Sequence, residues 1–427
     1  MTASETLPAI EAVWRIEAPR LIAGLARLVR DVGHAEDLAQ DALVAALEQW
    51  PIDGIPRNPG AWLMTAAKRR AIDGFRRGKL LERKHAELGY EIEALERTVP
   101  RLDEAMDDDV GDDLLRLMFI ACHPVLSTEA RVALTLRLLG GLTTDEIARA
   151  YLVTEPTIAQ RIVRAKRALS KARVPFELPH GEERAARLAS VLEVVYLIFN
   201  EGYAATSGSD WTRPALCEDA LRLGRVLAGL APDEPDVHGL VSLMELQASR
   251  LRARTGPSGE PVLLADQNRA LWDQLLIRRG LTALARAVSI SASMGSYTCQ
   301  AAIAACHARA PSAGDTDWAQ IATLYGMLAT IAPSPVVELN RGVAVAMASG
   351  PAAGLAVIDR LSEEPLLRHY HLLPAVRADL CARLERFAEA QSEFERAASL
   401  AQNERERALL RQRAMDCAAR AGTSVNT

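Results

Sequence analysis

The sequence is poor in the residues that build β-sheets. Aromatic side chains make up only 4% of its 427 residues, and runs in which β-branched and polar residues alternate are almost absent. Strands are enriched in both kinds of residue, whereas alanine, leucine and arginine, which dominate here, favour helices. An apolar fraction of 49% is enough for two to four packed domains. The sequence therefore predicts a globular, all-α protein.

Long apolar stretches are also missing. No run approaches the length that a membrane span needs. The N-terminal residues MTASETLPAIEAVW lack the basic start and continuous apolar segment of a secretory signal. We therefore expect a cytoplasmic protein without a membrane partner.

Motifs for metal or catalytic chemistry are absent as well. The six cysteines form no CxxC pair and have no histidine set at ligand spacing, so we expect buried, reduced thiols and no metal site, even at Cys306-His307. The chain has no phosphate-binding glycine loop, no nucleophile elbow and no HExxH motif. We expect neither an enzyme nor a bound cofactor.

The most informative segment is 142–169, which has the pattern of a helix-turn-helix. Thr143 or Thr144 can cap a first helix, and Pro156 suits the start of a second. Apolar residues of the second helix recur on one inward face: Ile158, Ile162, Ala165 and Leu169. Its polar and basic residues could contact base edges and phosphates: Thr157, Gln160, Arg161, Arg164, Lys166 and Arg167. The alternative is an ordinary helical hairpin with a solvated basic face.

Charge changes sign along the chain, although the net charge is only −5. Residues 68–84 are basic, residues 87–113 are acidic, and the helix-turn-helix is basic again. The acidic segment is either a solvated, extended linker or a polyanionic strand that occupies a channel used by nucleic acid. Both interpretations place a domain boundary there.

A second helical unit precedes this acidic segment. One of its predicted helices presents an acidic and partly apolar stripe suited to docking on a protein: Asp37, Gln40, Asp41 and Val44. A loop rich in proline and glycine follows at 51–60. The next predicted helix and this loop supply candidate nucleic-acid contacts: Arg57, Trp62, Lys68, Arg69, Arg76 and Arg77.

The runs HAEDLAQDALVAALEQW and NPGAWLMTAAKRRAIDGFRR, the acidic segment and the helix-turn-helix follow one another in this order. Over residues 10–175 the chain resembles the extracytoplasmic-function RNA polymerase sigma factors. The resemblance implies that the acidic stripe docks on core RNA polymerase, that the loop and basic helix lie near the melted −10 strand, and that the second helix of the helix-turn-helix reads the −35 element. It also implies that the acidic linker threads toward the RNA exit path.

Two residues depart from the family pattern. Arg69 stands where many members have asparagine, and a guanidinium favours phosphate or guanine. Leu152 occupies a turn position that is often glycine, so we expect this turn to be buried against another part of the chain.

The chain continues for 249 residues beyond Leu178, where an ordinary member would end. Segments 346–361 and 382–397 align with a period near 36 residues and predict helix pairs of tetratricopeptide type. The layout resembles the subgroup of these sigma factors that carries a long C-terminal extension of this kind. The predicted domains are 8–85 for region 2, 86–111 for the linker, 112–178 for region 4, 180–312 for a helical extension and 313–425 for the repeats.

The extension holds loosely grouped polar residues: Asn200, Glu201, Asp266 to Arg269, Trp272, Tyr297, Gln300, His307 and Asp317. We interpret them as helix caps and interhelical hydrogen bonds. Three functions remain open. The first is a sigma factor with a fused domain that regulates it and binds a protein or small-molecule signal. The second is an activator that binds duplex DNA without polymerase, and the third is an enzyme within 180–310, for which no substrate suggests itself.

Overall fold

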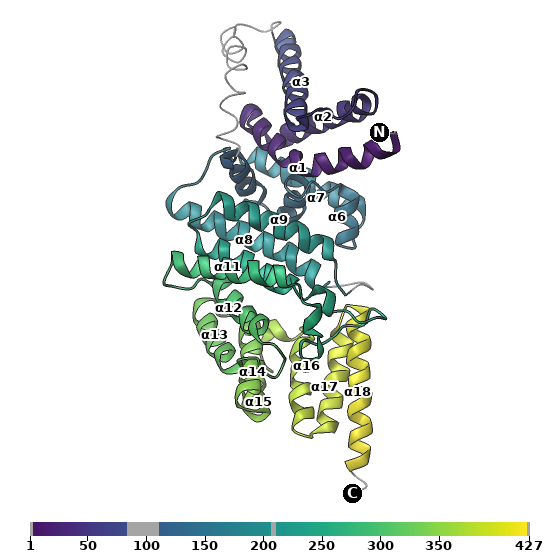
Figure 1. The fold of residues 1–427 in the computed structure, drawn as a ribbon, viewed down its shortest axis with the longest axis vertical. Coiled ribbons are helices and arrows are strands. Elements are labelled where there is room, and N and C mark those ends of the chain that lie inside the picture. The colour runs from purple at the N-terminus through teal and green to yellow at the C-terminus, as the bar shows by residue number, and fades with distance from the viewer. Residues whose placement is uncertain (1–2, 83–110, 206–210, 425–427) are drawn as a thin grey trace. The chain divides into compact units, whose positions relative to one another are not determined.

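The computed structural model describes residues 3–82, 111–205 and 211–424, and every extended regular element in these ranges is a helix (Figure 1). The one β-type pairing among them is an isolated bridge between Thr255 and Pro261. The predicted all-α class is confirmed. Contacts divide the chain into two compact units, 1–195 and 196–427.

The first unit begins with three helices and continues with those of the helix-turn-helix. Their bounds are α1 Ala3–Val29, α2 Val32–Asp53, α3 Pro59–Glu82, a helix described over 111–121, α5 Thr128–Leu138, α6 Thr144–Ala150 and α7 Glu155–Lys171. Helix α8, Gly181–Tyr203, starts in this unit and ends in the second.

Helices α1, α2 and α3 pack on one another around small and branched apolar residues. Leu25, Ala42, Ala46 and Leu63 are almost completely buried there. Gly33 and His34 lie in the first turn of α2. The chain turns at residues 30–31, because Asp31 accepts a hydrogen bond from the His34 backbone N–H and so caps the helix.

The core of the helix-turn-helix half extends into the start of α8. Val191 and Val195 of α8 are buried, and the Ser190 hydroxyl donates to the Cys122 carbonyl oxygen at 2.6 Å. The Arg187 guanidinium, which is also buried, donates to the carbonyl oxygen of Phe119. Residues beyond Leu178 therefore form part of the same packed unit as α5.

The second unit consists of helices joined by short loops and one longer loop at 251–272. Its elements after α8 are α9 Pro214–Leu230, α10 Pro235–Ala248, α11 Gln274–Ile290, α12 Ser296–Arg309, α13 Trp318–Ile331, α14 Pro335–Ser349, α15 Pro351–Asp359, α16 Leu372–Arg383, α17 Phe387–Leu400 and α18 Glu404–Ser424, with four short 3-10 helices at Leu251–Ala253, Leu264–Asp266, Arg269–Leu271 and Pro365–Leu367.

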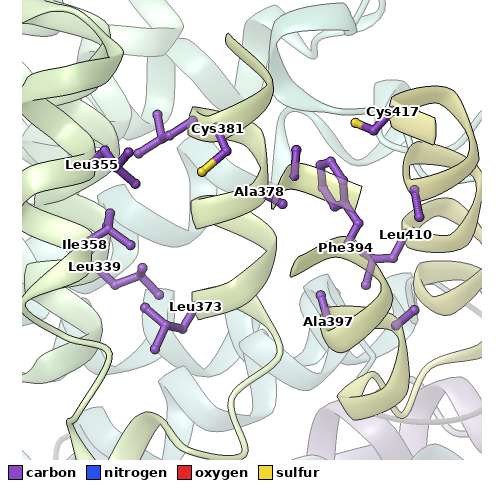
Figure 2. Close-up of a cluster of buried hydrophobic side chains, with 14 of the residues drawn as sticks. Leu339, Leu355, Ile358, Leu373, Ala378, Cys381, Phe394, Ala397, Leu410 and Cys417 are labelled. Carbon is purple, nitrogen blue, oxygen red and sulfur yellow. The ribbon is translucent and has the colours of Figure 1, made fainter. Parts of the chain in front are cut away.

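A continuous apolar core joins α14 to α18, each helix packing on the next (Figure 2). Phe394 of α17 is 1% exposed and points between α16 and α18. Leu339 and Ile358 close the α14 and α15 side of the same core, and Leu410 closes the α18 side. Helices in successive pairs thus bury one shared face.

The two segments with a period near 36 residues adopt the same local architecture. Each spans the end of one helix and most of the next, and α15 begins at Pro351 while α17 begins 36 positions later, at Phe387. A Cβ added at Gly354 would lie 2.3 Å from the Cβ of Ala346, so these helices touch through small residues. Ala390, the equivalent of Gly354, is completely buried.

All six cysteines are buried free thiols, as expected. The Cys306 Sγ lies 3.1 Å from the side-chain oxygen of Gln320, and the described residues hold no cluster of three metal-ligating side chains. Among the helices that the structure describes, none has both the length and the apolar character of a membrane-spanning segment.

Candidate nucleic-acid interface

Helix α6 begins with a capping box. The Thr143 hydroxyl accepts a hydrogen bond from the Glu146 backbone N–H at 3.1 Å, and the Glu146 carboxylate accepts one from the Thr143 backbone N–H at 2.8 Å. These bonds satisfy two groups at the start of the helix that would otherwise lack partners. The predicted cap at Thr143 is therefore confirmed.

The turn of the helix-turn-helix depends on Leu152, which adopts a φ of +51°. The Val153 backbone N–H then reaches the Ala148 carbonyl oxygen at 3.0 Å and closes α6. Glycine adopts this left-handed conformation with less strain than leucine. We expected Leu152 to be buried, and this was wrong: its side chain is 54% exposed, because the turn directs it into solvent.

Helix α7 packs through the predicted face. Its four apolar residues are all buried against α5 and α6: Ile158, Ile162, Ala165 and Leu169. Pro156 stands in the first turn, where its missing N–H costs no hydrogen bond. Since the inward face of α7 is fixed by these contacts, its remaining residues form the outer face.

Most of the polar residues on the outer face are available for a ligand. Gln160, Arg164 and Arg167 are exposed, while Thr157 and Arg161 are half-buried. Thr157 shares a hydrogen bond with the Thr154 hydroxyl at 2.8 Å. Within the described part of the chain, the three arginines form no ion pair and donate no side-chain hydrogen bond. Arg161 lies close enough to Glu129 to help lower the pKa of that carboxyl, whereas Arg164 and Arg167 have no ion-pair partner in the same part of the chain.

Lys166 differs from its neighbours, because it faces α2. Its Nζ lies 2.6 Å from the Glu36 carboxylate and 3.9 Å from that of Asp37. Glu36 is only 3% exposed and also accepts hydrogen bonds from Arg137 at 2.7 Å and from Gln40 at 2.7 Å. Lys166 was predicted to bind DNA, and in this arrangement its charge is neutralised within the protein.

Two further ion pairs join the halves of the first unit. Arg15 of α1 contacts the capping residue Glu146 of α6 at 2.7 Å. Arg27 lies 3.3 Å from the buried carboxylate of Asp113. The neighbouring Arg15 guanidinium and the hydrogen bonds from Thr143 hold the pKa of Glu146 below its usual value although burial opposes this. The contacts that Glu36 of α2 makes with Lys166 and Arg137 are therefore part of a polar interface to which α1 also contributes.

The predicted docking stripe on α2 is largely exposed. Asp37, Asp41 and Val44 are exposed, with Val44 at 49%, whereas Gln40 is half-buried beside Glu36. Asp41 pairs with Arg70 of α3 at 3.1 Å. The stripe therefore combines two exposed carboxylates, each with a basic neighbour, and one exposed apolar side chain.

The basic residues of α3 and of the loop before it differ in their exposure to solvent. Arg57 and Arg69 are exposed, and Lys68 is half-buried. Trp62 is half-buried and packs edge-on against Trp50, with ring centroids 5.3 Å apart. The side chains of Arg76 and Arg77 lie outside the described residues, as does the acidic linker up to residue 110.

Glu36 is the important residue that the sequence did not single out. It stands beside the predicted stripe, and its buried neighbours Ala35 and Leu38 belong to the inward face of α2. A carboxylate on an otherwise apolar face is the available signal, because such a group is buried only with a cationic partner.

Three segments of the chain match known protein families. Sigma-70 region 2 matches residues 14–80, and Sigma-70 region 4 matches residues 116–169. These segments cover most of α1 to α3 and the helix-turn-helix. A family of unknown function (DUF6596) matches residues 187–288.

Comparison with individual proteins gives relatives of two kinds. An uncharacterized protein of Rhizobium meliloti is 42% identical over 92% of both chains. The ECF RNA polymerase sigma factor SigK of Mycobacterium ulcerans is 30% identical over 34% of this chain and 75% of its own length. The ECF RNA polymerase sigma factor SigL of Mycobacterium tuberculosis is 28% identical over 34% of this chain and 76% of its own.

Proposed function

The chain belongs to the ECF RNA polymerase sigma factors, and from this premise we propose that α2 docks it on core polymerase while α3 and α7 contact two separate promoter elements. The observation that carries the proposal is the presence of both sigma regions, in order, on two helical bodies of the first unit. A protein that only binds duplex DNA would need the second of these bodies alone.

We assign −35 recognition to the outer face of α7. We assign base-edge contacts in the major groove to its early residues, Thr157, Gln160 and Arg161, and phosphate contacts to Arg164 and Arg167. The exposed charges of Arg164 and Arg167, which have no ion-pair partner in the described residues, support this assignment, because an anionic backbone would neutralise them.

We assign polymerase docking to Asp37, Gln40, Asp41 and Val44, and −10 contacts to the loop and first turns of α3. The exposed Arg57 and Arg69 suit a phosphate backbone, and the ring of Trp62, which is half-buried, suits an unstacked base. Arg76 and Arg77 are assigned with them on sequence alone.

We further propose that residues 196–427 bind a protein or a small molecule and regulate the sigma unit, without catalysing a reaction. Stacked helix pairs such as α14 to α17 form the extended surfaces that repeat proteins of the tetratricopeptide type use for binding. The fusion of such a surface to a sigma factor supports control within one chain.

The direct test is genomic run-off transcription with purified core polymerase and the full-length protein. We expect initiation from a defined set of promoters that core polymerase alone does not use. A chain that binds duplex DNA but neither binds core polymerase nor initiates would instead be an activator, and would overturn the proposal.

Truncated chains test the proposed regulatory role of residues 196–427, provided that they leave the sigma unit intact. A chain ending after Leu178 also loses residues 181–195, which pack on the helix at 111–121. A second chain ending after Val195 keeps these contacts. We expect transcription by the second chain to differ from that of the full-length protein, and equal activity would show that the extension has no regulatory role.

A further inference from the structure

Three arginines gather around aromatic rings in the second unit. The Cζ of Arg254 lies 3.7 Å from the ring centroid of Tyr203, and the Cζ of Arg269 lies 4.6 Å from that of Trp272. The Cζ of Arg250 lies between these rings, 5.8 Å from each centroid. Of these residues, only Arg269 and Trp272 were singled out from the sequence, as polar positions expected to cap helices or bond between them. The fold brings them close to Arg250, Arg254 and Tyr203.

The guanidinium groups are held in place by neutral partners. Arg250 donates to the Tyr203 hydroxyl at 2.7 Å. Arg269 donates to the carbonyl oxygens of His307 and Ala310, at 2.5 and 2.6 Å, where α12 ends. Arg269 is thus fixed by a structural role, whereas Arg254 is held chiefly by stacking on Tyr203.

Among the residues that the structure describes, the three guanidinium groups have no ion-pair partner, although Asp315 acts on Arg269 from a greater distance. Within the described ranges, none of the three arginines lies within ion-pair distance of an aspartate or glutamate. Burial and the charge of Arg250 lower the pKa of both Arg254 and Arg269. The same two causes, with Arg269, lower the pKa of His307 to about 4. Partly buried cations in proteins normally pair with a carboxylate, and here, among the described residues, the only contribution of this kind is the distant effect of Asp315 on Arg269.

The unpartnered polar atoms of the cluster are mostly donors. Four N–H groups are buried without an acceptor: Nε of Arg254 and Arg269 and Nε1 of Trp211 and Trp272. Gln267, 7% exposed, adds one unpartnered acceptor oxygen. The unpartnered atoms are mostly donors, and the three guanidinium groups have no ion-pair partner in the described part of the chain. A ligand that suits them is therefore an anion that supplies hydrogen-bond acceptors.

We propose that Arg250, Arg254 and Arg269 form a binding site for a small phosphorylated anion. Guanidinium groups bind phosphate oxygens through two parallel hydrogen bonds, and phosphate supplies acceptors without donors. Three cations favour a ligand with more than one negative charge. All three side chains are half-buried, so solvent reaches them. The site lies within residues 187–288, the segment that matches a family of unknown function.

The experiment uses the full-length protein and pyrophosphate as the probe, in a buffer free of phosphate. We expect pyrophosphate to change the fluorescence of the tryptophans at the site, Trp211 and Trp272, with saturation, and to raise the melting temperature by several degrees. Fluorescence of the unmodified chain needs no variant and therefore does not depend on whether a variant folds. No saturable change at millimolar pyrophosphate would overturn the proposal.

Variants then locate the site. Arg254→Gln should weaken pyrophosphate binding at least tenfold, and Arg254→Lys, which keeps the charge but loses the planar donor pair, should give an intermediate loss. Arg360→Gln removes an exposed arginine directly after α15 and should bind as the unmodified protein does. Equal affinity in Arg254→Gln and Arg360→Gln would place the binding elsewhere and overturn the assignment.

A comparison of probes tests the chemical class. ATP and pyrophosphate should both bind, and citrate, which carries a similar charge on carboxylates, should bind at least tenfold more weakly. Citrate binding as tight as that of pyrophosphate would overturn the assignment to a phosphorylated ligand. None of these measurements involves polymerase or DNA, so their outcome is independent of the proposed transcription activity.

Discussion

The Lys166 ammonium of α7 lies 2.6 Å from the buried Glu36 carboxylate of α2. This ion pair joins the helix assigned to −35 recognition to the helix assigned to polymerase docking. Arg137 completes the cluster from α5 with a hydrogen bond of 2.7 Å to the same carboxylate. One acidic side chain therefore contacts two cations at the junction between the two sigma regions.

Glu36→Gln should destabilise the first unit. The amide removes the buried counter-charge shared by Arg137 and Lys166 and, among the described residues, leaves only the exposed Asp37 near Lys166. Removal of one partner from a buried ion cluster costs about 3 kcal/mol of the free energy of unfolding. Urea unfolding followed by circular dichroism measures this. Asp37→Asn is the matched control, because Asp37 is exposed and lies 3.9 Å from Lys166. Equal unfolding midpoints of the two variants would contradict the prediction.

Arg161→Ala and Arg164→Ala should each weaken binding to the −35 element. Loss of a base or phosphate contact costs about 1–3 kcal/mol per side chain, and loss of a phosphate contact also reduces the dependence of affinity on salt. The measurement is binding of the polymerase complex to a promoter found by run-off transcription, at two salt concentrations. Arg360→Ala, in the second unit, serves as the control. Unchanged affinity in both α7 variants at moderate salt would mean that another face of the helix meets DNA.

Val44→Lys should weaken binding to core polymerase by about tenfold, which corresponds to about 1.4 kcal/mol. Val44 is the exposed apolar residue of the docking stripe, so a charge there must be buried or must displace the partner. Gln49→Lys adds the same charge to an exposed position of α2 outside the stripe. Pull-down of core polymerase at matched concentrations compares the two, and an equal loss in both variants would remove the stripe from the interface.

The sequence predicted those parts of the fold that depend on neighbours along the chain. The Thr143 cap and the buried residues Ile158 and Ile162 follow from spacing within one helix, and the structure confirms them. Leu152 was misjudged, because its apolar character suggested burial while the backbone conformation of the turn, which spacing does not show, sets its direction.

These patterns could not predict contacts between residues that lie far apart along the chain. Glu36 and Arg137 are 101 positions apart, and no periodicity relates them. The same holds for Arg250 and Tyr203, which are 47 positions apart and meet where α8 and α10 end. Tertiary packing determines such pairs, because it brings together the few partners that can satisfy a buried charge.

Acidification should destabilise the second unit through His307. Burial, with the nearby Arg250 and Arg269, lowers the pKa of His307 to about 4, against about 6.5 in an unfolded chain. The unfolded state therefore takes up a proton as the pH falls below 6.5, whereas the folded state stays neutral until about pH 4. The contribution of neutral His307 to the free energy of unfolding is therefore fully present above pH 6.5. It falls by about 3 kcal/mol between pH 6.5 and pH 4.

Thermal unfolding between pH 7.5 and 4.5 measures this loss against the variant His307→Phe, whose side chain does not titrate and can keep the edge contact with Trp318. We expect the melting temperatures of the two proteins to converge as the pH falls, because only the unmodified chain loses the contribution of a neutral histidine. His369→Gln, which removes an exposed histidine, should follow the unmodified protein. Parallel curves for the unmodified chain and His307→Phe would show that His307 takes up its proton equally in both states, and that the arginine cluster does not act on it.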